Sequence, residues 1–192
     1  GNVRRPNHWN TSWDQAKFET VAHRFADLSE RGYGVSLLND CKYGHDVKDN
    51  VLRITLIRAA THPDHSQDQG LHQFTYSLLP HGGDIVDGGT VREACSLNQP
   101  LRAVEGNLEL PFTSFLSFDK DCVEVDAVKK TEDGKFVAVR FHDFTGGTNR
   151  LRVRPGFAWK RRCISDLRER PLEDWKAVSY THLRAHETDQ YR

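Results

Sequence analysis

Two histidines and two aspartates stand close together in one short segment of the chain, Thr61 to Gly70. His62, Asp64, His65 and Asp68 are all residue types that bind zinc, and a catalytic zinc site needs three protein ligands with an open fourth position. Histidines are also common in exposed loops that bind nothing. We therefore predict that this segment is a solvated loop and that the chain binds no metal.

Paired carboxylates suggest a second kind of chemistry, the hydrolysis of glycosidic bonds. Retaining glycosidases generally use two carboxyl groups about 5–5.5 Å apart, one as nucleophile and one as acid/base. Asp40 and Asp46 are near one another in the sequence, and so are Asp64 and Asp68. Aspartate also favours turns, because its side chain bonds to nearby backbone. We predict turn residues here and no catalytic residue in this chain.

Composition argues against several classes of protein. Lys and Arg together number 27, as do Asp and Glu, so the formal net charge is zero and no nucleic-acid partner is expected. No stretch approaches the ~20 apolar residues of a membrane span, and the N-terminus carries no signal-peptide pattern. The four cysteines form no CxxC motif and are expected to be reduced, buried thiols. These features predict a cytoplasmic globular protein, and the absence of methionine suggests a fragment.

Strand signals dominate the first half of the chain. Tyr33–Asn39 and Val51–Arg58 are β-branched or aliphatic runs, and the polar residues 40–50 between them indicate a hairpin-like loop. Leu71–Leu79 has one face more apolar than the other, as a half-buried strand requires. Thr90–Leu97 predicts a short helix, with Thr90 as its cap and a proline beyond its end.

The second half alternates in the same way. Val123–Lys129, Lys135–Phe144 and Asn149–Arg154 are strand-like and are separated by turn residues, which predicts a β meander. Residues 104–119 contain the expected boundary between two β units. Residues 14–30 are ambiguous: periodicity alone favours a helix, although residues 20–28 also permit a strand.

A series of short motifs runs along the chain in order. It comprises RPNHWNTSWDQAKFE (5–19), HRFADLSERGYGVSLLN (23–39), NDCKYG (39–44), DQGLHQF (68–74), YSLLPH (76–81), LNQPL (97–101), VKKTED (128–133), VRFHDF (139–144) and DLRERPL (166–172). Together these motifs resemble the C-terminal β region of glycoside hydrolase family 38, the cytosolic/vacuolar-type α-mannosidases. Each motif alone is weakly specific, but their order and spacing follow the family over residues 1 to about 176.

The resemblance implies an all-β fold with one short helix. Residues 1–105 would be the C-terminal part of a large β-sandwich, a portion of a mutarotase-like supersandwich. Residues 106–177 would form a smaller, β-sandwich-like unit. The resemblance also implies a strand over residues 20–28.

The activity implied is retaining, zinc-dependent hydrolysis of terminal α-mannosides. In the family, the zinc ligands and the aspartate nucleophile belong to an N-terminal domain, whose HxD-type zinc motif has no match in this sequence. The implied partners are therefore a mannose-containing oligosaccharide and the missing catalytic domain. Zinc is expected in the parent enzyme, and no cofactor in this fragment.

Substrate contact is the role that remains for the chain's loops. Residues 39–44 and 61–70 each follow a strand and combine charged, amide and aromatic groups, which suit sugar hydroxyls and ring faces. In the family, loops of this region reach over the edge of the catalytic pocket. The candidate contact residues are Asp40, Lys42, Tyr43, Asp64 and Asp68. The alternative is that NDCKYG is a structural turn and that the second loop only packs between domains.

The C-terminal tail has a different pattern. Val178–Thr188 (VSYTHLRAHET) resembles a translated sequencing adapter. We therefore expect residues 178–192 to be an artefact and disordered.

The alternative for the whole chain is a stand-alone carbohydrate-binding β-sandwich module. Such a module needs an exposed row of aromatic side chains on one sheet face. Trp9, Trp13, Trp159 and Trp175 are scattered along the sequence and form no such row.

Overall fold

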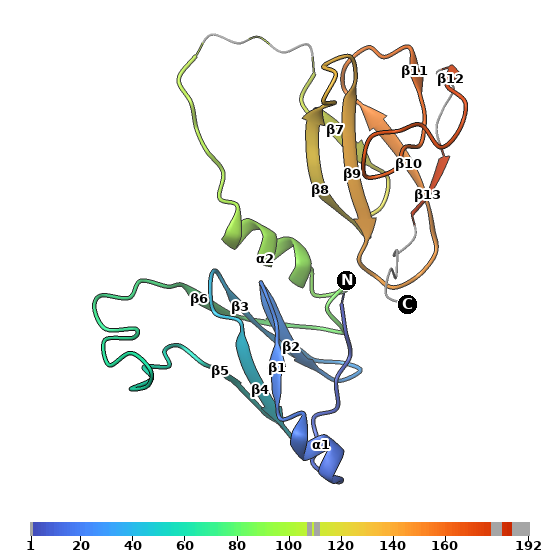
Figure 1. Ribbon diagram of the computed structural model, residues 1–192. Helices are drawn as coiled ribbons and strands as arrows, with labels where there is room; N and C mark the ends of the chain where they lie inside the picture. The colour runs from blue at the N-terminus through green and yellow to red at the C-terminus, as the bar shows by residue number, and fades with distance from the viewer. Residues whose placement is uncertain (1, 107–108, 110–111, 178–181, 186–192) are drawn as a thin grey trace. The chain divides into compact units, whose positions relative to one another are not determined.

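The computed structural model describes residues 2–106, 109, 112–177 and 182–185, with side chains up to Ala177. The chain divides into two units, one formed by Arg4–Ala103 and the other by Gly1–Val3 with Val104–Arg192. Each is built mainly from strands in small antiparallel sheets (Figure 1). The predicted all-β class is confirmed, although the described residues contain two short helices, neither long and apolar enough to cross a membrane.

The unit Arg4–Ala103 begins with a short helix followed by a three-stranded sheet. In α1 (Ser12–Ala16), the Thr11 hydroxyl accepts the Asp14 N–H while the Asp14 carboxylate accepts the Thr11 N–H, which is a capping box. The sheet has the order β1-β4-β5, formed by β1 (Glu19–Val21), β4 (Gly44–Lys48) and β5 (Val51–Ile54).

A second sheet in this unit carries the helix α2 (Thr90–Asn98). Its order is β2-β3-β6, formed by β2 (Phe25–Ser29), β3 (Gly34–Asn39) and β6 (Tyr76–His81). The buried apolar side chains of β3 and α2 are each at most 5% exposed: Leu37, Leu38, Val91 and Ala94. The last two are three residues apart and so share one face of α2. The strand expected over residues 20–28 is confirmed only in part, because the structure has two strands there, β1 and β2, which end and begin on either side of residues 22–24 and belong to different sheets.

The structure corrects four predictions in this unit. The strand predicted over Val51–Arg58 ends at Ile54. Residues 40–50 are not a simple loop, because they contain β4, which pairs with β5. β4 has the sequence GHDVK, whose polar residues give little apolar alternation. The strand predicted over Leu71–Leu79 begins only at Tyr76. Thr90 is not the cap of α2: Gly89 takes that position with φ 65°, and the Thr90 side chain is buried.

The other unit contains the remaining strands. β8 (Val123–Lys130) pairs with β9 (Val137–Asp143), and a bulge interrupts their register between Val125 and Ala127. A second sheet has the order β13-β10-β7, formed by β7 (Leu116–Phe118), β10 (Asn149–Pro155) and β13 (His182–Ala185). β11 (Arg161–Arg162) pairs with β12 (Lys176–Ala177). The predicted meander is therefore right for β8 and β9 but wrong for β10, which pairs with β7.

The core of this second unit is small. Cys122 and Leu151 are buried, and Val123 and Phe141 pack against them. All four cysteines are free, as predicted, but only Cys122 is buried: Cys95 and Cys163 are partly exposed and Cys41 is exposed.

Part of the C-terminal tail belongs to a sheet. His182–Ala185 pairs antiparallel with Asn149–Arg152 of β10. A free strand edge offers unpaired backbone groups to any extended segment, which explains how a polar segment can join the sheet. The prediction of disorder over residues 178–192 is therefore wrong for residues 182–185. Residues 178–181 and 186–192 lie outside the described part of the chain, and the adapter origin stays a prediction.

Candidate functional site

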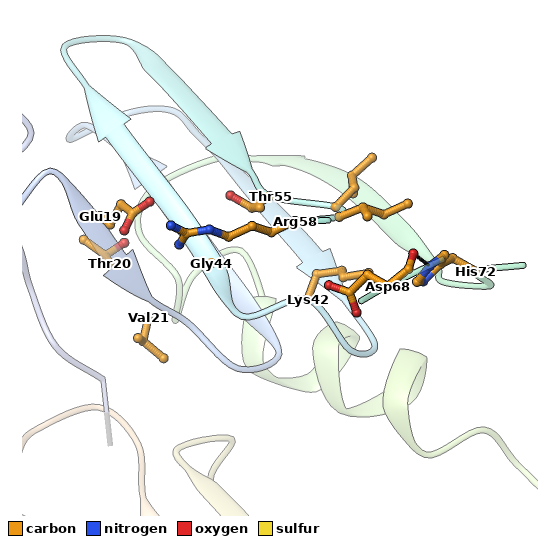
Figure 2. A pocket seen from close by; sticks show the side chains of 11 residues that line it. Glu19, Thr20, Val21, Lys42, Gly44, Thr55, Arg58, Asp68 and His72 are labelled. Carbon is orange, nitrogen blue, oxygen red and sulfur yellow. Dashed lines mark hydrogen bonds between the residues drawn. The ribbon is translucent and has the colours of Figure 1, made fainter. Parts of the chain in front are cut away.

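A groove of about 660 Å³ lies beside the β1-β4-β5 sheet, within the unit Arg4–Ala103 (Figure 2). It is bounded by β1, by the turn before β4, by the segment after β5 and by the long connection to β6. Its polar side chains are those of Glu19, Thr20, Lys42, Thr55, Arg58, Asp68 and His72. Since this set contains both cations and carboxylates, the groove can donate and accept hydrogen bonds.

Lys42 reaches the groove from the NDCKYG turn that follows β3. Its backbone N–H donates to Asn39 Oδ1 at 2.7 Å, and its Nζ lies 4.8 Å from the centroid of the Phe74 ring. The hydrogen bond fixes the start of the turn, and the cation–π contact holds the ammonium in place. The turn therefore presents a positioned cation to the groove.

Asn39 anchors this turn in the interior of the unit. The residue is 0% exposed. Its N–H donates to the Arg24 carbonyl at 2.9 Å, and its own carbonyl accepts from Asn98 Nδ2 of α2 at 3.0 Å. Its Nδ2 has no hydrogen-bond partner among the described residues. Through Asn39 the turn is bonded both to the strand region before β2 and to the helix.

Asp68 and His72 come from the connection between β5 and β6. Asp68 has φ 55°, a left-handed conformation that Asp tolerates better than most residues. His72 Nε2 donates to the Asp68 carbonyl oxygen at 2.7 Å, at the end of the groove where Figure 2 also shows Lys42. Because Nε2 carries the proton in this contact, Nδ1 of the neutral ring is an acceptor.

The other three candidate residues are not part of the groove wall. Both carboxylate oxygens of Asp40 accept from the Thr75 N–H, each at 3.0 Å. Asp64 accepts from the backbone and the hydroxyl of Ser66 at 2.9 and 2.8 Å. The Tyr43 ring lies 5.2 Å from that of His23. Of the five candidates, the structure brings Lys42 and Asp68 together in the groove.

Hydrogen bonding also shifts the acidity of two of these carboxyls. The Cys41 thiol, and after it the Thr75 backbone, hold the pKa of Asp40 below its ordinary value. The Ser66 backbone and hydroxyl do the same for the pKa of Asp64. Asp64 therefore uses its charge in a local turn contact, whereas Asp40 uses its charge in a contact with the distant residue Thr75.

The histidine-rich segment shows no ligand set for a metal. His62 and His65 are exposed, with ring centroids 5.3 Å apart. Within the part of the chain that the structure describes, no group of three or more His, Cys, Asp or Glu side chains could hold a metal ion. These residues do not fit a zinc site.

A buried polar cluster that the sequence did not predict joins the β2-β3-β6 sheet to α2. Ser36 Oγ donates to Asp27 Oδ1 at 2.6 Å and lies 2.7 Å from Thr90 Oγ1. One nitrogen of His81, Nε2, faces both Asp27 Oδ1 at 2.8 Å and Ser36 Oγ at 3.2 Å. A catalytic triad uses the two ring nitrogens separately, and Ser36 is 0% exposed. The cluster is therefore structural.

Two of the tryptophans take part in packing within their own units. The Trp9 ring packs edge-on against that of Phe18, with the ring centroids 6.2 Å apart, and Lys48 Nζ lies 4.5 Å from the Trp9 ring centroid. The Trp175 ring lies 4.4 Å from Phe136. Trp13, by contrast, is 77% exposed.

Comparison with solved structures shows which fold the chain shares. The chain is similar to an α-mannosidase from Enterococcus faecalis V583, with a TM-score of 0.75 and 22% identity over 96% of this chain and 22% of that one. A glycosyl hydrolase family 38 protein from Enterococcus faecalis gives a TM-score of 0.74 and 23% identity, over 96% of this chain and 23% of that one. At such identities the likeness shows the fold, a β-rich part of a larger chain.

Sequence comparison gives the family. Residues 1–66 match the glycosyl hydrolases family 38 C-terminal domain, and residues 123–187 match the family 38 C-terminal beta sandwich domain. The chain is therefore C-terminal sequence of glycosyl hydrolase family 38. The second match continues beyond residue 176, where the resemblance was predicted to end.

Individual relatives agree with this family. Human α-mannosidase 2C1 is 40% identical over 176 residues, 89% of this chain and 17% of the relative. α-Mannosidase G of Dictyostelium discoideum is 41% identical over 152 residues, 77% of this chain and 14% of the relative. α-Mannosidase of Saccharomyces cerevisiae is 39% identical over 139 residues, 71% of this chain and 13% of the relative. The chain thus spans less than a fifth of the length of these curated relatives.

Proposed function

We propose that the chain is the non-catalytic C-terminal part of a retaining, zinc-dependent α-mannosidase that acts on terminal α-mannosides of oligosaccharides in the cytoplasm. It would support the fold of that enzyme and form part of the rim of its substrate pocket. Relatives named as α-mannosidases, at 39–41% identity, support the proposal. Because the chain spans at most 17% of their length, the catalytic step is assigned to the rest of the polypeptide.

The convergence of Lys42 and Asp68 in one groove supports the role at the rim. A lysine ammonium donates to hydroxyl oxygens, whereas a carboxylate accepts from hydroxyl groups, so the pair can hold a sugar from two sides. Among the described residues, neither side chain forms an ion pair. Binding residues concentrate on such loops when a rigid scaffold positions them.

Zinc belongs, in this proposal, to the catalytic domain rather than to this chain. The described residues offer no ligand set for it. No step of the hydrolysis is therefore assigned to the residues present here.

The first test is the activity of the 192-residue chain by itself. We expect no hydrolysis of an aryl α-mannoside in the presence of added zinc, because the catalytic groups are assigned elsewhere. Turnover that co-purifies with the chain and disappears with a chelator would contradict the proposal.

The second test concerns the rim and uses the full-length gene product. Lys42→Met and Asp68→Asn should each lower kcat/KM about tenfold or more, since a hydrogen bond to a charged group contributes about 1.5–3 kcal/mol. Lys135→Met, at a lysine 73% exposed in the other unit, is the control and should leave kcat/KM unchanged. If the Lys42 and Asp68 variants match the control at equal melting temperature, the groove has no role in catalysis.

A further inference from the structure

The groove has two polar ends. Figure 2 shows Lys42, Asp68 and His72 together at one end, and the Arg58 guanidinium near Glu19 and Thr20 at the other. The contact residues predicted from the sequence that line the groove, Lys42 and Asp68, both lie at the first end. The second end combines the strand β1 with the segment that follows β5.

The charges at this second end are available to a ligand. Glu19 and Arg58 are both exposed, and neither side chain has an ion pair or hydrogen bond with any other residue that the structure describes. A guanidinium offers five donors in a planar fork, and a carboxylate only accepts. Neighbouring hydroxyl groups on a sugar ring both donate and accept, so they can satisfy the two charges at once.

Apolar surface accompanies these charges. Val21 and Ile57 also line the groove and are 66% and 48% exposed. Aliphatic side chains can pack on the C–H faces of a sugar ring. Since both signs of charge are present along the groove, a neutral polyhydroxylated ligand fits it better than an anion or a cation.

The size of the groove exceeds the needs of one hexose. Ligand pockets usually measure about 300–1,000 Å³ for drug-sized molecules. At about 660 Å³, this groove lies in the middle of that range. A groove of this volume therefore has room for a ligand of disaccharide size.

We propose that the groove binds two linked sugar units of an oligosaccharide, and that Glu19 and Arg58 hold the unit farther from Lys42 and Asp68. The inference rests on the proposed function for the identity of the sugar, mannose. It assigns a specificity role to two residues outside the predicted loops. Arg58 would decide whether a second sugar unit contributes to affinity.

The experiment measures sugar binding by the 192-residue chain itself, with methyl α-mannoside and an α-linked mannobiose as probes. Heteronuclear NMR titration detects weak binding and maps it to residues. The disaccharide should bind about tenfold more tightly, the effect of one additional charged hydrogen bond. Arg58→Met should remove this preference while leaving the affinity for methyl α-mannoside unchanged. Lys42→Met should weaken both.

A control variant and a second groove variant complete the experiment. Arg31→Met changes an exposed arginine outside the groove and should behave as the parent chain. Glu19→Gln repeats the test with a smaller change, in case Arg58→Met fails to fold. Equal affinity of the parent chain for the two sugars overturns the inference. A preference for the disaccharide that persists in both Arg58→Met and Glu19→Gln also overturns it.

The inference and the proposed function can fail separately. If Lys42→Met lowers kcat/KM in the full-length product while the 192-residue chain shows no disaccharide preference, only the inference is wrong. Binding of neither sugar by the 192-residue chain also overturns the inference.

Discussion

Asp40 and Thr75 bond to one another in both directions. Both carboxylate oxygens of Asp40 accept from the Thr75 N–H at 3.0 Å, and the Asp40 N–H donates to the Thr75 carbonyl at 3.2 Å. The contact ties the turn after β3 to the residue that precedes β6. It also occupies the carboxylate that the motif NDCKYG suggested for substrate. The substrate role of Asp40 stays a prediction, but this contact favours a role in the fold.

Asp40→Ala should therefore lower the melting temperature. It removes both acceptors of the Thr75 N–H, a loss of about 1 kcal/mol for one hydrogen bond at an exposed position. Asp40→Asn keeps one acceptor oxygen and should cost less. Thermal melting of the two variants beside the parent measures this order. Identical melting temperatures of all three proteins would show that the contact does not stabilise the fold, and would favour the substrate role of Asp40.

Thr90→Val tests the buried cluster between the sheet and α2. The substitution keeps the shape of the side chain but removes the hydroxyl 2.7 Å from Ser36 Oγ. Ser36 Oγ keeps its bond to Asp27, so the loss is that of one hydrogen bond, about 0.5–1.5 kcal/mol, and denaturant unfolding should shift accordingly. Ser96→Ala, on the exposed face of the same helix, is the control. Equal stability of Thr90→Val and the parent would show that the hydroxyl is not needed.

Gly88→Ala tests the packing of His81 in the same cluster. A Cβ at Gly88 would lie 2.6 Å from His81 Nδ1, too close for the ring to stay in place. Overpacking of this kind costs about 1–3 kcal/mol. At Gly82 the nearest atom to a new Cβ is 4.0 Å away, so Gly82→Ala should be tolerated. The prediction is wrong if the two alanine variants unfold at the same denaturant concentration.

Asp143 should make the second unit sensitive to acid. Burial raises the pKa of this carboxyl, but hydrogen bonds from Thr145 and Asn149 outweigh burial and hold the pKa below its ordinary value. A lowered folded pKa gives stability that is present above the unfolded pKa, about 3.9, and is lost as the pH falls through the folded pKa. Asp143→Asn should therefore melt lower than the parent at neutral pH, with the difference shrinking below about pH 4. A constant difference across this range contradicts the assignment.

Apolar patterning predicted the elements whose side chains make the core. β3, with the sequence GVSLLN, contains three aliphatic residues and was expected within one residue of its observed start. β4 was missed because its pairing with β1 and β5 depends on backbone contacts that its polar sequence does not reveal. The buried cluster was missed for a related reason. Asp27, Ser36 and Thr90 look like ordinary surface residues until the sheet and helix bring them together.

The candidate site was predictable in part. Lys42 and Asp68 lie in motifs that family resemblance singles out. Glu19 and Arg58 lie 39 positions apart in the sequence, and only the order β1-β4-β5 places their segments at the same groove. Local patterns carry no information about such a non-local pairing. A strand order is needed before these two residues can be considered together.

The position of Asn39 has a consequence for how the protein can evolve. Its side chain holds the Lys42 turn, while its carbonyl accepts from Asn98 in α2. A change at Asn98 therefore reaches the groove through a single intermediate residue, although Asn98 itself is no part of the groove wall. Positions 39 and 98 are expected to covary among homologues, with a replacement at one compensated by a replacement at the other. The residues at positions 19 and 58 should instead vary with the sugar that each homologue binds.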